Sequence, residues 1–263
     1  MVKAKNPLVH QITNYVTVND CANIVLALGG SPVMADDESE VEEMVSIASA
    51  LVINIGTLNA RTIKSMLAAG KKANQLGIPV ILDPVGAGAT ALRTGTTEKI
   101  LAEIQLSVLR GNRSEIKTIA GFATKTRGVD SVDDIPDAGI GEGAEIAGVL
   151  ADKLHCVVAI TGKQDIISDG VRTGFIDNGH QILSKVTGTG CMATALIGCY
   201  AGVTDDHFLS ATVGIMTMGL AGEKAWAEVG SSAGIGSFKV ALFDWIFKMT
   251  PEDLAQGGKF HEA

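Results

Sequence analysis

The residues best suited to chemistry in this 263-residue chain form the run Thr187-Gly188-Thr189-Gly190-Cys191-Met192. Glycines let such a backbone turn several N–H groups toward one point. The segment that follows, Ala193–Gly202, predicts a helix whose positive N-terminal end faces the same point. The run therefore predicts an anion cradle that needs no basic side chain. It does not match G-x-x-x-x-G-K-[ST], and it lies too late for a G-x-G-x-x-G turn after a first strand. A loop that needs glycine only for packing is the alternative.

A second group of candidate residues stands where short apolar runs end: Gly56-Thr57, Asp83-Pro84, Arg110-Gly111-Asn112 and Thr161-Gly162. Each has a purely structural interpretation. Asn112 with Glu115 three residues later is typical of a helix capping box, Asp83 can cap a turn, and Arg110 can form a surface ion pair. Their common position, rather than any one of them, favours a functional site.

The elements that must hold these residues are apolar runs alternating with helical patterns. Buried strands are predicted at 51–55, 80–82, 107–109 and 156–160, with a helix over about 59–76 and a short one from Arg113. Such an alternation is typical of a parallel sheet. In an open α/β sheet, ligands bind at the carboxyl ends of the strands. We therefore expect the candidate residues to share one edge.

The pattern changes late in the chain. Asp169-Gly170 lies between short alternating runs over 166–176 and predicts a β-hairpin. The apolar segments 191–203 and 208–222 are shorter than the roughly 18–20 residues of a membrane span, and they predict buried, closely packed helices. No repeat or linker interrupts the sequence, so we expect one domain over residues 1–263.

The composition narrows the class of partner. The chain has 21 basic and 29 acidic residues, a net charge of −8, which disfavours nucleic acid and anionic membranes. Its 31 glycines and 11 aromatic residues fit an α/β protein with many tight turns. The acidic segment 36–43 predicts a solvated face, with a metal site as the alternative.

The N-terminus and the cysteines favour a cytoplasmic protein. No long apolar stretch follows the first lysines, as a signal peptide would require. The four cysteines include no C-x-x-C pair, and Cys191 and Cys199 lie about 12 Å apart along one predicted helix, too far for a disulfide. Reduced thiols are expected.

Several motifs resemble one family. The run 186–192 resembles the G-x-G-D anion-hole motif of ribokinase-like kinases, with Cys191 at the usual aspartate position, and 112–115 resembles their N-x-x-E magnesium motif. The cysteine variant is similar to the hydroxyethylthiazole kinase family, as are the segments 10–16, 30–35 and 82–88. The likeness runs in consistent order over roughly residues 6 to 230.

The resemblance implies a ribokinase-like three-layer α/β/α fold with a mostly parallel sheet and a small late hairpin. It implies transfer of the ATP γ-phosphoryl group to 4-methyl-5-(2-hydroxyethyl)thiazole, as a step of thiamine biosynthesis. It also implies Mg²⁺ and a homotrimer with the thiazole pocket at a subunit interface. By the same likeness the site residues would be Asn14, Met34, Gly56 and Gly188 for the thiazole, Arg110, Asn112 and Thr161 for ATP, Asp83 and Glu115 for the metal, and Gly188, Thr189, Gly190 and Cys191 for catalysis.

Cys191 is the departure from the superfamily pattern. A carboxylate at this position would act as general base. A thiol at a helix N-terminus can ionise, but neighbouring phosphate charge raises its pKa again. The hypothesis is that Cys191 positions the acceptor and acts as a weak base, while the N–H cradle supplies most of the rate.

Three other functions fit parts of the pattern. One is a kinase of the same fold for a pyrimidine alcohol or a sugar. Another is an ATP-dependent hydro-lyase that repairs a hydrated nicotinamide cofactor, for which an aspartate at position 191 would be better suited. The third is a nucleotide sensor without turnover, which the set Asp83, Arg110, Asn112 and Glu115 disfavours.

Overall fold

The computed structural model describes residues 2–125 and 140–263. Within these residues one sheet has nine strands in the order β2-β1-β3-β4-β5-β6-β7-β8-β9. The pairs from β2 to β6 are parallel and those from β6 to β9 are antiparallel. The strands are β1 Leu8–Ile12, β2 Ser31–Val33, β3 Ala50–Asn54, β4 Val80–Asp83, β5 Val108–Asn112, β6 Val157–Thr161, β7 Asp165–Ser168, β8 Thr173–Ile176 and β9 Phe260–Glu262.

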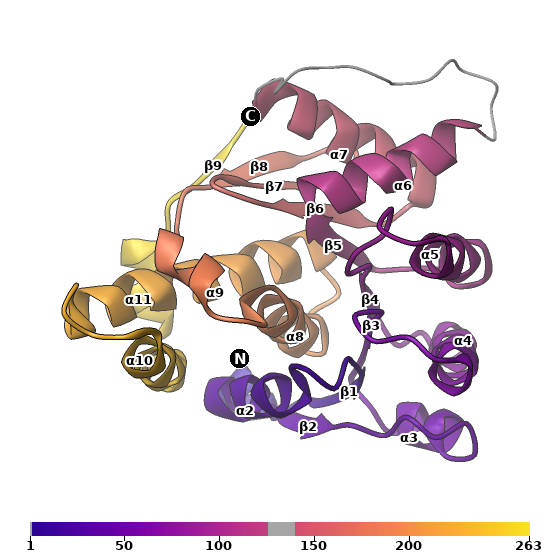
Figure 1. The fold of residues 1–263 in the computed structure, drawn as a ribbon, viewed down its shortest axis with the longest axis horizontal. Coiled ribbons are helices and arrows are strands. Elements are labelled where there is room, and N and C mark those ends of the chain that lie inside the picture. Colours follow the sequence, from indigo (N-terminus) through magenta and orange to yellow (C-terminus); the bar gives the residue numbers. More distant parts are fainter. Residues whose placement is uncertain (1, 126–139) are drawn as a thin grey trace.

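Helices cover both faces of this sheet (Figure 1). One layer holds α3 Val41–Ser46, α4 Ala60–Leu76, α5 Ala91–Glu103, α6 Arg113–Lys125 and α7 Ile140–Leu154. The other holds α2 Val18–Leu28, α8 Thr189–Ala201, α9 His207–Val229 and α10 Ile235–Lys248. The short elements are α1 Val2–Lys5, the 3₁₀ turn η1 Gln181–Lys185 and α11 Pro251–Gly257. The predicted three-layer α/β/α architecture is confirmed.

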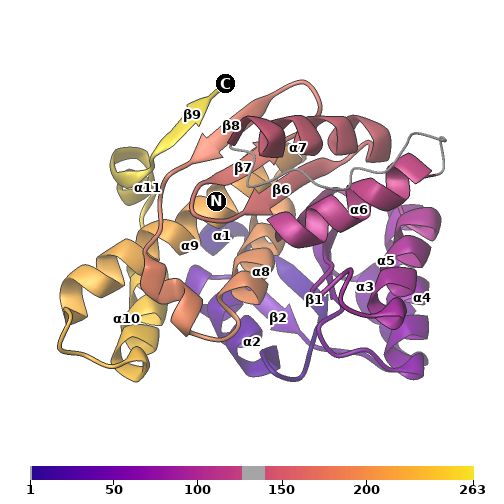
Figure 2. The same ribbon diagram turned by 45° about the horizontal axis from the view of Figure 1, so that its top comes forward.

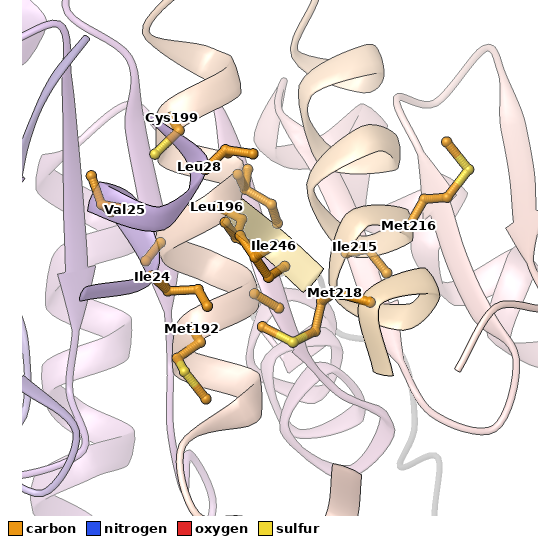
Figure 3. Close-up of a cluster of buried hydrophobic side chains, with 14 of the residues drawn as sticks. Ile24, Val25, Leu28, Met192, Leu196, Cys199, Ile215, Met216, Met218 and Ile246 are labelled. Atoms are coloured by element: carbon orange, nitrogen blue, oxygen red, sulfur yellow. The ribbon is translucent and has the colours of Figure 1, made fainter. Parts of the chain in front are cut away.

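The core forms because the parallel strands are apolar on both faces. In β3, Leu51 and Ile53 face the α3–α7 layer, whereas Val52 faces α2 and α8. Figure 3 shows the second layer, where branched and sulfur-containing side chains of α2, α8, α9 and α10 interdigitate. The labelled members are Ile24, Val25, Leu28, Met192, Leu196, Cys199, Ile215, Met216, Met218 and Ile246.

Most predicted elements are confirmed with small shifts at their ends. The strand predictions became β3 to β6, the Asp169-Gly170 turn joins β7 to β8, and the helix over 59–76 is α4, whose cap is Asn59. The segments 191–203 and 208–222 fall on α8 and α9, which are buried and pack on each other. Of the described helices, none is both long and apolar enough to cross a membrane.

The sequence did not predict β1, β2 and β9. Polar His10 and Gln11 occupy two of the five positions of β1, and Pro32 stands inside the three-residue edge strand β2, so neither has an apolar run. The last strand, β9, pairs with β8 from the C-terminal tail (Figure 2).

The acidic segment 36–43 is a solvated face, as predicted. Its carboxylates are mostly exposed, and Arg61 of α4 pairs with Asp36 at 2.9 Å. Throughout the two described ranges, no three His, Cys, Asp or Glu side chains gather as a metal site.

Candidate active site

The candidate residues converge because parallel strands end at the same edge of the sheet. The register pairs Asn54 with Asp83 at the ends of β3 and β4, and Asn112 with Thr161 at the ends of β5 and β6. Helix α8 lies across β1, β3 and β4 and brings its first turn to this edge. The predicted common edge is therefore confirmed.

The first turn of α8 begins earlier than predicted. The helix starts at Thr189 rather than Ala193, because Gly188 adopts a left-handed backbone with φ of 89° and serves as the N-cap. The first helical bond runs from Met192 N to Gly188 O at 2.8 Å. The N–H groups of Thr189, Gly190 and Cys191 precede it and so belong to the donors that a helix leaves for a ligand. These residues thus lie in the helix and not in a loop before it.

Gly188 is required by its left-handed backbone and by Thr17, whereas a side chain at Gly190 would have to move the Arg110 guanidinium. A Cβ at Gly188 would lie 2.6 Å from the side chain of Thr17, and one at Gly190 would lie 2.8 Å from Nη1 of Arg110. The guanidinium of Arg110 therefore passes directly over the helix N-terminus. Backbone donors and an arginine face the same space there, as a polyanion requires.

Asp83 lies at the centre of the edge and is fully buried. Its Oδ2 accepts hydrogen bonds from Asn54 Nδ2 and Thr194 Oγ1, each at 2.9 Å, and lies 3.6 Å from Arg110 Nη1. Its Oδ1 is buried without a hydrogen-bond partner. Burial raises the pKa of Asp83 to about 6, against the opposing effect of Arg110. Arg110 alone therefore does not offset the cost of burying the negative charge of Asp83.

Cys191 is half-buried beside this carboxylate. Its Sγ accepts hydrogen bonds from Asn54 Nδ2 at 3.2 Å and Asn14 Nδ2 at 3.4 Å. Burial first, and the charge of Asp83 second, raise the pKa of the thiol. Cys191 is therefore a neutral thiol at physiological pH, despite its position at a helix N-terminus.

Arg110 and Thr161 are in contact. Arg110 Nη2 donates to Thr161 Oγ1, and its Nε has no hydrogen-bond partner. The next residue, Gly162, donates its N–H to Asp165 Oδ1 at 2.9 Å. Burial raises the pKa of Asp165 to about 6. At the ends of β5 and β6, Arg110 is therefore held by Thr161, and the Gly162 turn is held by the Asp165 carboxylate.

Asn112 and Glu115 form the capping box that the sequence left open as one interpretation. Glu115 N donates to Asn112 Oδ1 at 2.9 Å, and Asn112 N donates to Glu115 Oε2 at 2.8 Å. Glu115 Oε1 also accepts from Gly86 N at 2.8 Å. The carboxylate thereby joins the start of α6 to the loop that follows Asp83.

The residues expected at the acceptor pocket are placed less uniformly. Gly56 follows β3 and lies against Asn14, so that a Cβ there would be 2.9 Å from the Asn14 side chain. Met34 instead follows the edge strand β2, two places from β3 in the sheet, and packs half-buried on the α2 and α8 core. The structure thus brings Gly56 and Asn14 together, whereas Met34 lies after β2 against the α2 and α8 core.

The residues proposed for Mg²⁺ suit that ion. The unpartnered Oδ1 of Asp83 and its raised pKa both fit a carboxylate built to face a cation. Glu115 adds a second carboxylate one strand away, with two of its lone pairs used by backbone donors. Two carboxylates, with water and phosphate completing the shell, are typical of magnesium in phosphoryl-transfer sites.

Sequence reasoning missed three residues of the site. Asn54 links Asp83, Cys191, Asn14 and Gly56, and Thr194 bonds Asp83 from within α8. Thr17 packs on Gly188 and donates to Asn14 Oδ1. The one signal available was the polar Asn54 at the end of an otherwise apolar run.

Comparison with known proteins agrees with this geometry. A model of the Hydroxyethylthiazole kinase family matches residues 1–252. The hydroxyethylthiazole kinase of Alkaliphilus oremlandii is 60% identical over 261 residues, covering 99% of this chain and 95% of the relative. A solved hydroxyethylthiazole kinase structure from Pyrococcus horikoshii OT3 superposes with a TM-score of 0.89 at 41% identity, over 100% of this chain and 96% of the other.

A more distant structure shares the fold alone. A ribokinase-like superfamily protein from Enterococcus faecalis V583 is 11% identical, with a TM-score of 0.65, over 94% of this chain and 88% of its own. The predicted ribokinase-like fold is thereby confirmed. Given the match over residues 1–252 and these identities along nearly the whole length, the chain belongs to the hydroxyethylthiazole kinase family.

Proposed function

We propose that this chain, acting as a single kinase domain, transfers the γ-phosphoryl group of ATP to the hydroxyl of 4-methyl-5-(2-hydroxyethyl)thiazole. The observation that carries the proposal is the meeting of Asp83, Arg110 and the first turn of α8 at one point. Phosphoryl transfer requires positioning and charge neutralisation more than covalent help from the protein. The family supplies the acceptor, a small neutral alcohol.

The proposal gives the residues of this edge the following roles. The N–H groups of Thr189, Gly190 and Cys191 stabilise the transferred group from the end of α8, with Gly188 beside the acceptor hydroxyl. Arg110, Asn112 and Thr161 bind ATP at the ends of β5 and β6. Asn14 and Gly56 line the acceptor pocket, with Met34 at its rim.

Asp83 and Glu115 would hold Mg²⁺, directly or through water. When bound, the ion supplies positive charge to the phosphate oxygens. Among the described residues, the Arg110 guanidinium forms an ion pair with the buried Asp83 carboxylate, at 3.6 Å.

Cys191 has a modest chemical role in this proposal. A neutral thiol that accepts two N–H groups is a poor general base, so Cys191 mainly orients the hydroxyl. The backbone donors and Arg110 then contribute most of the transition-state stabilisation.

The setting of the reaction is also proposed from the family. The product would be a thiazole phosphate for thiamine biosynthesis in the cytoplasm, and the assembly a homotrimer with sites at its interfaces. Sedimentation equilibrium tests the trimer, and a monomer with full activity would contradict it.

A coupled assay of ADP release tests the reaction itself. In separate reactions, the protein is incubated with saturating MgATP and with the thiazole alcohol, a pyrimidine alcohol, a sugar or no acceptor. Stimulation by the thiazole alcohol alone is expected. If no alcohol stimulates turnover, the kinase proposal is wrong, and preference for another alcohol would shift it to the alternative acceptor class.

A further inference from the structure

Asn54 hydrogen-bonds to more residues of the site than any other of the site residues described above. It is the last residue of β3, and only 1% of its surface is exposed. Its amide joins four residues expected in the site: Asn14, Gly56, Asp83 and Cys191.

The hydrogen bonds fix which way the Asn54 amide points. The backbone N–H of Gly56 donates to Asn54 Oδ1 at 2.9 Å, and a backbone N–H can only donate. The Nδ2 group therefore points to the other side, where it meets Asp83 Oδ2 at 2.9 Å and Cys191 Sγ at 3.2 Å. Both of its hydrogens are used.

The same reasoning fixes Asn14. The N–H of Thr17 donates to Asn14 Oδ1 at 3.1 Å, so Asn14 Nδ2 points inward. There it donates to Asn54 Oδ1 at 2.9 Å and Cys191 Sγ at 3.4 Å. All four amide hydrogens are committed, and two of them end on the sulfur.

Consequently Cys191 is held as a hydrogen-bond acceptor. Neither amide nitrogen has a lone pair for the thiol proton, so the S–H bond must point away from both. The sulfur and the Asp83 carboxylate are tied to the two hydrogens of one NH₂ group, so their positions depend on each other.

We propose that Asn54 is a positioning residue that locks the Cys191 sulfur and the Asp83 carboxylate into one array, and thereby aims the thiol at the acceptor hydroxyl. The proposal rests on the kinase function proposed above. It assigns Asn54 no contact with ATP or acceptor. Charged and titratable neighbours of the thiol are Asp83 of β4, Arg110 of β5 and Cys21 of α2.

Cys191 offers a direct readout of this array without turnover. It is half-buried, whereas Cys21, Cys156 and Cys199 are buried, so iodoacetamide should modify Cys191 first. Cys191→Ala serves as the blank for the labelling. The alkylation rate against pH then reports the environment of the sulfur.

The main variant is Asn54→Asp, which keeps the size of the side chain but removes both N–H donors. We expect the alkylation profile to move up by about 1 pH unit or more, because a donor to sulfur is lost and a carboxylate is added. We also expect kcat to fall about 100-fold, with the KM for ATP within about threefold of wild type. Wild-type profiles and wild-type kcat in a folded Asn54→Asp protein would overturn the proposal.

Two further variants keep the test decisive. Two neighbouring acids at positions 54 and 83 could prevent the Asn54→Asp protein from folding. In that case the exchange variant Asn54→Asp/Asp83→Asn restores one acid and one amide. Its Cys191 alkylation profile should still lie above the wild-type profile. A wild-type thiol profile in the exchange variant would overturn the proposal. Asn59→Ala is the control. It removes the exposed N-cap of α4, in the segment that follows Asn54 and β3, and should lower Tm without moving the alkylation profile or kcat.

The labelling result separates the two proposals. If no alcohol stimulates ADP release by the wild type, the proposed function fails. A shifted alkylation profile in Asn54→Asp would still support the array in that case, whereas an unchanged profile would refute it.

Discussion

Helix α8 contains the dipeptide Gly-Cys twice, and the two copies do opposite things. Gly190-Cys191 lies in the first turn, under Arg110 and against the amides of Asn14 and Asn54. Gly198-Cys199 lies two turns later in the dry core, where a Cβ at position 198 would be 2.7 Å from Val52. At the helix end, where backbone N–H groups have no helical partner, the Gly-Cys pair faces the candidate site. Within the helix, where those N–H groups are bonded, the same pair serves packing.

The two Gly-Cys pairs also lie in regions that affect the stability of the fold in opposite ways. The first copy belongs to a site with a buried, partly unpartnered carboxylate, an arrangement that opposes folding. The second copy belongs to the layer that stabilises the fold (Figure 3). Changes at the site should thus alter activity more than stability, and changes in the core should do the reverse.

Asp83→Asn should give the largest effect on activity. Loss of the carboxylate removes a proposed cation ligand and a partner of Arg110, so kcat should fall about 10³-fold. Stability should not fall with it. The pKa of Asp83 is raised from 3.8 to about 6, so its favourable contribution is complete below about pH 4 and is lost as pH rises through 6.

The measurement is therefore Tm at two pH values beside kcat. At pH 8 the Asp83→Asn variant should melt at or above wild type, and at pH 4 this advantage should disappear. A variant much less stable than wild type at pH 8 would contradict the division between site and core.

The two glycines give the next effect. In Gly190→Ala the new Cβ displaces Arg110, and we expect kcat to fall about 100-fold with little change in Tm. Gly198→Ala is the matched control on the same helix. It overpacks Val52 and Val9 and should cost about 1–3 kcal/mol of unfolding free energy with kcat unchanged. Steady-state kinetics and chemical denaturation of both variants check this pair, and equal effects on kcat would break the comparison.

The two cysteines give a smaller effect. Cys191→Ala should lower kcat by roughly 10–100-fold, less than the loss of a strong general base. Cys199→Ala should leave kcat unchanged and lower the unfolding free energy by about 1–2 kcal/mol, because its sulfur is fully buried. A larger loss in Cys191→Ala, with circular dichroism showing an intact fold, would make the thiol the principal base.

The pH profile gives the smallest effect. With Asp83 acting as a carboxylate, kcat/KM should fall about tenfold per pH unit below about 6. Asp165 has a similarly raised pKa, and its carboxylate accepts the N–H of Gly162, so Asp165→Asn should keep the fall of kcat/KM below about pH 6. If this fall disappears in Asp165→Asn, the titrating group has been misassigned.

The sequence predicted the parallel core and most of the shared edge because both depend on local patterns. Apolar runs that end in Asp83 or Arg110 mark a strand and its carboxyl end together. The start of α8 was misjudged because the left-handed Gly188 lets the helix begin at once. The hydrogen bonds of Asn54 to Asp83 and Cys191 join residues 29 and 137 positions apart, and no local sequence pattern contains such pairs.

The strand order has a consequence for how the protein is made. From β3 to β9 each new strand joins the sheet beside the one synthesised before it. On a ribosome, where chains emerge N-terminal end first, the sheet can therefore grow along one edge without waiting for a distant partner. The residues of the site, in contrast, are synthesised far apart in time. Arg110 emerges about eighty residues before the first turn of α8, and Asp83 more than one hundred before it, so a nascent chain carries the buried acid well before the helix that covers it.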